Sequence, residues 1–94
     1  MVTRKGRANG TKTVVQPKIN LADKGRCIRV TAELPGAREE TIQIDIERSI
    51  LILSARGEGM RYKKEISLPA EVRYSTKRFR NGILDLYLEK TGPQ

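Results

Sequence analysis

Hydrophobic and polar residues alternate with a period of two through much of the chain. In residues 27–34 every even position is apolar, and Arg29, Thr31 and Glu33 stand between them at odd positions. In residues 42–46 every even position is an isoleucine. Because successive side chains of a β-strand point to opposite faces of its sheet, both stretches are predicted to be half-buried strands.

Three further strands are less regular. Residues 50–53 are apolar at every position, which is typical of a central strand covered on both faces. In residues 62–68 the apolar side chains again share one parity, and Pro69 ends that strand. Residues 19–23 are predicted to form a weaker strand before the first alternating segment.

The strongest local signal is the dipeptide Asn81-Gly82, which separates residues 77–80 from the alternating segment 83–88. Asn-Gly tolerates the two positive φ angles of a type I′ turn, so these segments are predicted to form a tight β-hairpin. The chain then has about seven short strands and no segment with convincing helical periodicity. We therefore predict an all-β protein with the architecture of an antiparallel β-sandwich.

The composition fits one small domain and excludes several kinds of chemistry. The chain has 94 residues, of which 32% are charged and 37% hydrophobic, a globular balance. It has no histidine and only one cysteine, Cys27, which excludes His-based catalysis, a disulfide framework and zinc sites built from several Cys or His ligands. Asp45 and Glu47 share a strand face, where paired carboxylates are usually only solvated. The sequence therefore predicts no enzymatic activity and no cofactor or metal.

Positive charge is concentrated near the N-terminus. The formal net charge is +8, and residues 1–18 carry five basic residues and no acidic residue. Residues 1–15 are predicted to be a disordered basic arm, residues 16–90 the folded domain, and residues 91–94 a short tail. The arm has two interpretations, a solvated tail that keeps the protein soluble or a weak electrostatic contact to nucleic acid.

The sequence predicts neither a membrane span nor a secretory signal. The longest apolar run, residues 50–53, is far too short to cross a bilayer. The basic N-terminus lacks the apolar segment of a signal peptide. We therefore expect a cytoplasmic protein.

Several short motifs follow one another along the chain. They are Ala-Glu-Leu-Pro-Gly at 32–36, an isoleucine-rich strand at 40–46, the apolar run at 50–55, a segment ending in Leu-Pro at 62–69, and Phe-Arg-Asn-Gly-Ile-Leu at 79–84. Together they resemble the α-crystallin domain of small heat shock proteins, a stress-response family, over residues 16–90. The resemblance implies an immunoglobulin-like β-sandwich. It also implies an ATP-independent holdase chaperone, which binds exposed apolar segments of unfolding client proteins and prevents their aggregation.

The resemblance also implies a binding groove. In the family, a groove between two strands accepts apolar tails, and the matching positions here are Ile42, Ile44, Tyr74 and Thr76. In such a groove, alternate side chains of an extended segment enter pockets. The isoleucines are equally explained as ordinary core residues, and both interpretations stay open.

Several features depart from the family pattern. Many microbial members have a long loop with a swapped strand, whereas only residues 56–61 separate two strands here. Residues 91–94 contain no I-x-I/V motif of the kind that docks on a neighbouring subunit, and the usual apolar N-terminal arm is replaced by a basic one. Lys77 stands where the family signature has alanine. We therefore expect a homo-oligomer that is a dimer or another small assembly.

Two alternative functions follow from other features. Basic and aromatic residues gather at 73–80, which would suit a basic nucleic-acid-binding β module. The chain has three tyrosines and one phenylalanine, too few for an obvious base-stacking platform. The other alternative is a specialised family member that binds one dedicated partner assembly, such as gas-vesicle proteins.

Overall fold

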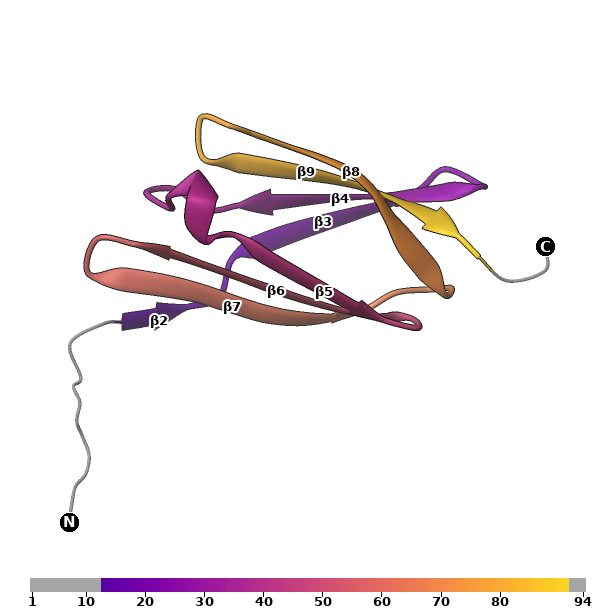
Figure 1. Cartoon of the computed structure of the whole chain (residues 1–94), viewed down its shortest axis with the longest axis horizontal. Coiled ribbons are helices and arrows are strands. Elements are labelled where there is room, and N and C mark those ends of the chain that lie inside the picture. Colours follow the sequence, from indigo (N-terminus) through magenta and orange to yellow (C-terminus); the bar gives the residue numbers. More distant parts are fainter. Residues whose placement is uncertain (1–12, 92–94) are drawn as a thin grey trace, which may run out of the picture.

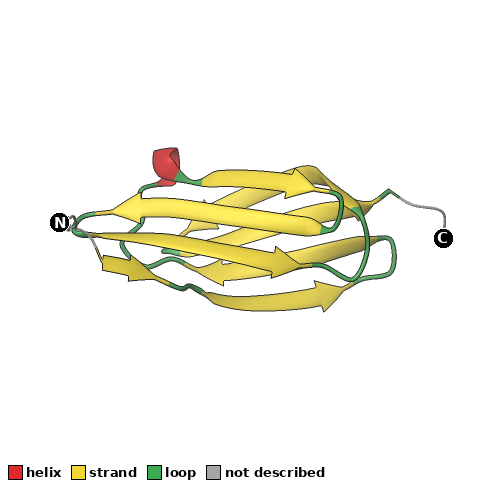
Figure 2. Cartoon of the chain, turned by 90° about the horizontal axis from the view of Figure 1, so that it is seen from below, coloured by secondary structure: helices red, strands yellow, loops and turns green. Residues whose placement is uncertain are grey.

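The computed structural model describes residues 13–91, and these residues form strands with one short helical turn (Figure 2). Residues 1–12, which make up most of the predicted basic arm, lie outside the described residues. The elements are β2 (Thr13–Val15), β3 (Lys18–Asp23), β4 (Cys27–Glu33), the 3-10 turn η2 (Glu39–Thr41), β5 (Gln43–Glu47), β6 (Ile50–Gly57), β7 (Met60–Ser67), β8 (Val72–Arg80) and β9 (Ile83–Lys90).

Two four-stranded sheets face each other and form a sandwich (Figure 1). The strand order is β2-β7-β6-β5 in one sheet and β3-β4-β9-β8 in the other. Within residues 13–91 every strand pair is antiparallel except β2 and β7, which are parallel. The predicted all-β, immunoglobulin-like sandwich is confirmed, with eight strands in residues 13–91 in place of about seven.

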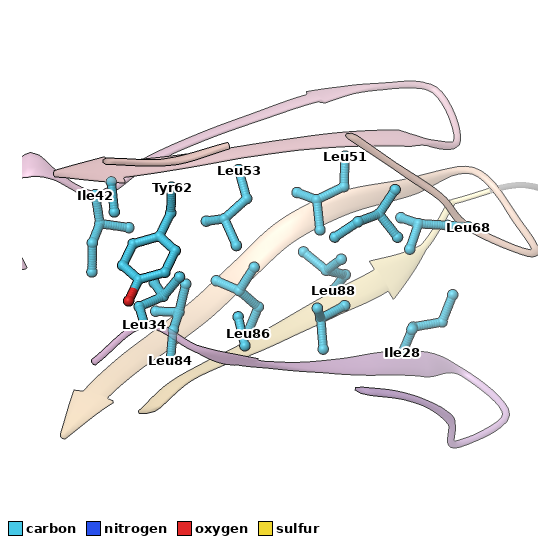
Figure 3. Packing of buried hydrophobic residues seen from close by; sticks show 14 of the residues in the cluster. Ile28, Leu34, Ile42, Leu51, Leu53, Tyr62, Leu68, Leu84, Leu86 and Leu88 are labelled. Atoms are coloured by element: carbon cyan, nitrogen blue, oxygen red, sulfur yellow. The ribbon is translucent and has the colours of Figure 1, made fainter. Parts of the chain in front are cut away.

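The core lies between the two sheets and is built from alternate residues of their strands (Figure 3). The side chains predicted to face inward from residues 27–34 are all fully buried. On β9 the buried residues Leu84, Leu86 and Leu88 face Leu51 and Leu53 of the opposite sheet (Figure 3). Burying one such leucine stabilises the fold by about 1.5–3 kcal/mol relative to leaving it exposed, so this layer supplies the main driving force for the sandwich.

The Asn81-Gly82 turn has the predicted geometry. Both residues have positive φ angles, 53° at Asn81 and 78° at Gly82, as a type I′ turn requires. The turn joins β8 to β9, with Arg80 opposite Ile83. The carbonyl oxygen of Gly82 accepts a hydrogen bond of 2.7 Å from the backbone N–H of Leu34, so the hairpin tip is tied to the end of β4.

The sandwich begins earlier than the predicted domain boundary. Thr13–Val15, the last three residues of the predicted arm, form β2, which pairs with Met60–Tyr62 of β7. The side chain of Val15 packs against the core, whereas Val14 is exposed. The prediction of a disordered segment up to residue 15 is therefore wrong for these residues, because two β-branched valines extend an existing sheet.

The apolar segment at 50–53 is central in its sheet but is not covered on both faces. It lies in β6, between β5 and β7. Leu51 and Leu53 are buried against the other sheet, whereas Ile50 and Ile52 are only half-buried on the outer face. β6 therefore packs against the other sheet with one of its two faces only. The short connection after β6 is confirmed, since only Glu58 and Gly59 separate it from β7.

Candidate partner-binding groove

Two strand edges lie on the same side of the sandwich. β5 is the last strand of one sheet, and β8 is the last strand of the other. The two strands contact each other where β8 crosses towards the sheet that contains β5 (Figure 1). Each has one side on which no further described strand pairs, so its backbone N–H and C=O groups are available to an added strand.

Between these edges lies a hollow of about 230 Å³. Its lining residues are Ile42, Ile44, Tyr74 and Lys77. Ile42 is 8% exposed and Ile44 is half-buried, so both also pack on the core, while the ring of Tyr74 is 47% exposed at the rim. The structure thus brings together three of the four residues predicted from the sequence, in a hollow whose floor is apolar.

The fourth predicted residue, Thr76, is not part of this hollow. Tyr74 lies opposite Leu88 on β9, but a bulge in β8 then skips Ser75 and places Thr76 opposite Tyr87. Leu88 is buried and Tyr87 is on the outer face, so Thr76 faces outward. The prediction for Thr76 came from the resemblance to the family, and the structure does not bring this residue into the hollow.

Lys77 occupies the position expected for Thr76. It lies opposite the buried Leu86, so its side chain leaves β8 on the groove side.

The sequence contained one signal for the bulge in β8. Val72 is buried and Phe79 is half-buried against the core, although their separation of seven residues places them at opposite parity. A regular strand cannot turn both side chains inward, so one extra residue must lie between them.

The charges around the groove are unevenly neutralised. Within the described part of the chain the ion pairs are Arg29 with Asp85, Arg73 with Glu89, and Lys90 with Asp23, and Lys77 belongs to none of them. The hydrogen bond from the Arg29 guanidinium to Asp85 raises the pKa of Arg29 above its ordinary value. Lys77 therefore contributes an unneutralised positive charge beside an apolar floor.

The arrangement of β8 does not favour a nucleic-acid module. Arg78 and Arg80 lie opposite Asp85 and Ile83 on the outer face, whereas Tyr74 and Phe79 lie on the opposite, inner face. Arg78 and Arg80 are thus separated by the sheet from Tyr74 and Phe79, and Lys77 is the basic residue of this segment that shares their face. The stacking of bases on Tyr74 or Phe79 beside these arginines would require both kinds of side chain on one face.

The described residues hold no grouping of three His, Cys, Asp or Glu side chains that could bind a metal ion. Over the same residues, no helix has the length and apolar character needed to cross a membrane.

Neither protein-family models nor curated proteins give a match to this chain. Solved structures do share its fold. HSP18.5 from E. histolytica has a TM-score of 0.70 at 19% identity, covering 85% of this chain and 92% of that protein. Heat shock protein 16.0 from Schizosaccharomyces pombe has a TM-score of 0.70 at 20% identity, and the match covers 90% of this chain and 73% of that protein. A mutant of hsp14.1 from Sulfolobus solfataricus P2 has a TM-score of 0.72 at 24% identity, and the match covers 81% of this chain and 79% of that protein.

These similarities define the architecture. The protein is an immunoglobulin-like β-sandwich of the α-crystallin-domain type. This is the fold of the small heat shock proteins, as the motifs along the sequence predicted, and at these identities the likeness establishes the fold.

Proposed function

We propose that this protein is a chaperone of the small heat shock protein type. It holds unfolding client proteins by their exposed apolar segments and prevents their aggregation without ATP. The observation that carries this proposal is the hollow between β5 and β8, which has Ile42 and Ile44 as its floor and lies where both sheets present an open edge. Segments that unfold in a client are extended and apolar, which are the properties such a groove accepts.

The groove has the parts that strand addition requires. The free edge of β8 or β5 supplies backbone donors and acceptors, and the floor formed by Ile42 and Ile44 supplies apolar contact. Each Å² of apolar surface that a client segment buries there contributes about 25 cal/mol. The two isoleucines act both as core and as floor, because Ile42 is buried while Ile44 is half-buried.

The assembly that fits this chain is a small homo-oligomer in the cytoplasm. The two residues between β6 and β7, Glu58 and Gly59, leave no room for an additional strand that could exchange with a neighbour. Beyond Tyr62, β7 has no described partner on its outer side, since β2 pairs only with Met60–Tyr62. A small assembly through exposed edges is therefore supported more than a large cage, and a native mass of twelve or more subunits would contradict it.

The test is an aggregation assay with a thermally unfolding client and variants of the groove. Ile44→Asp replaces part of the apolar floor by a carboxylate and should remove most of the protection, because an apolar client segment would then bury a charged group instead of gaining apolar contact. Tyr74→Ala removes the exposed rim and should weaken protection without disturbing the core. The control is Gln43→Asp, which adds the same charge to the exposed face of the same strand.

Circular dichroism must show that each variant is folded. Protection by Gln43→Asp should equal that of the unmodified protein. Full protection by folded Ile44→Asp and by Tyr74→Ala would show that clients bind elsewhere, and the proposed role of the groove would then be wrong.

A further inference from the structure

Lys77 reaches the groove only because β8 carries a bulge. Tyr74 and Lys77 lie opposite Leu88 and Leu86, which are two residues apart on β9. Tyr74 and Lys77 are therefore neighbouring groove positions, about 7 Å apart along the strand. A continuous strand would have placed Thr76 at that position and turned Lys77 to the outer face.

The ammonium group of Lys77 has no carboxylate partner among the described residues. The other lining residues, Ile42, Ile44 and Tyr74, include no aspartate or glutamate. Glu40 and Asp45 are near in sequence to the isoleucines, but they line a separate hollow on the outer face of the sheet that contains β5.

On the side of β9, the acidic residues are already engaged. Asp85 accepts hydrogen bonds from Arg29 and Thr31, and Glu89 accepts two from Arg73. No described acidic residue therefore neutralises the groove from either wall.

An extended segment that enters the groove covers part of the Lys77 side chain. If that segment is wholly apolar, the ammonium group loses water and gains no partner, which opposes binding. If the segment carries a carboxylate at this point, the lost hydration is replaced by a charge-assisted hydrogen bond.

We propose that Lys77 makes this groove selective for extended segments in which an aspartate or glutamate stands two residues from an apolar residue, so that both side chains enter the groove from the same face of the segment. This inference rests on the proposed function of the groove and adds to it a preference for acidic over neutral or basic segments. Because Lys77 is exposed at the rim, the selectivity should be modest, about two- to fivefold in affinity at low salt, and it should weaken as salt screens the charges.

The experiment uses three fluorescent peptides that are identical except for the residue two positions after the second of two isoleucines, which lies on the same face as both of them. The sequences contain Ile-Ser-Ile-Ser-Glu, Ile-Ser-Ile-Ser-Gln or Ile-Ser-Ile-Ser-Lys, and each is titrated with the full chain. The groove variant is Lys77→Glu. Its control is Arg78→Glu, which makes the same change of charge at the next residue but on the outer face, opposite Asp85.

The unmodified protein should bind the glutamate peptide most tightly and the lysine peptide least tightly. Lys77→Glu should reverse this order, while Arg78→Glu should keep it. Equal affinities for the three peptides, or the same response in both variants, would overturn the selectivity but leave the groove intact. If the unmodified protein binds none of the peptides, the proposed groove itself is wrong, and the selectivity fails with it.

Discussion

The hydroxyl group of Tyr62 donates a hydrogen bond of 2.6 Å to the carbonyl oxygen of Pro35. Tyr62 belongs to β7 in one sheet, and Pro35 follows β4 in the other. The ring of Tyr62 is 4% exposed, and its hydroxyl group points across the core towards the far sheet (Figure 3). This bond therefore links the two layers at a point where packing alone would leave a phenol and a carbonyl without partners.

Tyr62→Phe removes this hydrogen bond and keeps the ring. The Pro35 carbonyl oxygen loses its protein partner, so the free energy of unfolding should fall by about 1 kcal/mol. Urea denaturation followed by circular dichroism measures the difference. The control is Tyr87→Phe, at an exposed site on β9, which should change stability less. Unchanged stability of Tyr62→Phe would show that the bond contributes nothing.

A second close contact between the two sheets lies at Gly57. A Cβ atom added there would overlap the carbonyl oxygen of Gly36, which lies in the turn after β4. Because this neighbour is backbone, Gly57→Ala should force the turn to move and lower stability by about 1–3 kcal/mol. Glu58→Ala, at the exposed neighbouring residue, is the control and should be close to neutral. A Gly57→Ala variant with unchanged stability would mean that the turn moves freely.

Much of the sandwich could be predicted because its strands have one face in the core. In residues 27–34 and 83–88, burial selects apolar residues at every second position, so the sequence itself carries the register. The turn between β8 and β9 could also be predicted, since few dipeptides other than Asn81-Gly82 accept two positive φ angles so easily.

The parts that could not be predicted lie at the sheet edges. Most residues of β8 are exposed, so the bulge at Ser75 leaves only one trace in the sequence, the seven-residue spacing of the apolar residues Val72 and Phe79. The positions that match the family's groove include Thr76 and not Lys77, whereas the structure places Lys77 in the hollow. β2 is only three residues long and gains its stability from a partner 47 residues further along the chain, which a local pattern does not contain.

A pair of deletions measures the contribution of β2. Removal of residues 1–15 takes away the strand and the side chain of Val15, whereas removal of residues 1–12 leaves both in place. The longer deletion should be less stable than the shorter one by about 1–2 kcal/mol, through lost apolar burial and lost strand hydrogen bonds. The comparison uses urea denaturation of both shortened chains. Equal stabilities would show that β2 adds nothing to the sandwich.

Asp23 makes stability depend on pH. The backbone N–H of Gly25 donates a hydrogen bond of 2.9 Å to its carboxylate, and the Lys90 ammonium group donates another of 2.9 Å. These bonds, with the Gly25 bond as the larger cause, lower the pKa of Asp23 below its ordinary value. A carboxylate with a lowered pKa in the folded state stabilises the fold above its unfolded pKa, about 3.9. That contribution is lost as the pH falls through the folded pKa.

Asp23→Asn should remove this contribution. The variant should be less stable than the unmodified protein at pH 6, and the difference should shrink as the pH falls below about 3.9, because the protonated aspartate also lacks a charge. Urea denaturation at a series of pH values from 6 downwards measures both proteins under the same conditions. Asp45→Asn, on an exposed strand face, provides the control for a general effect of removing one negative charge. A difference between the unmodified protein and Asp23→Asn that stays constant with pH would show that the ion pair with Lys90 and the bond from Gly25 do not favour the charged carboxylate.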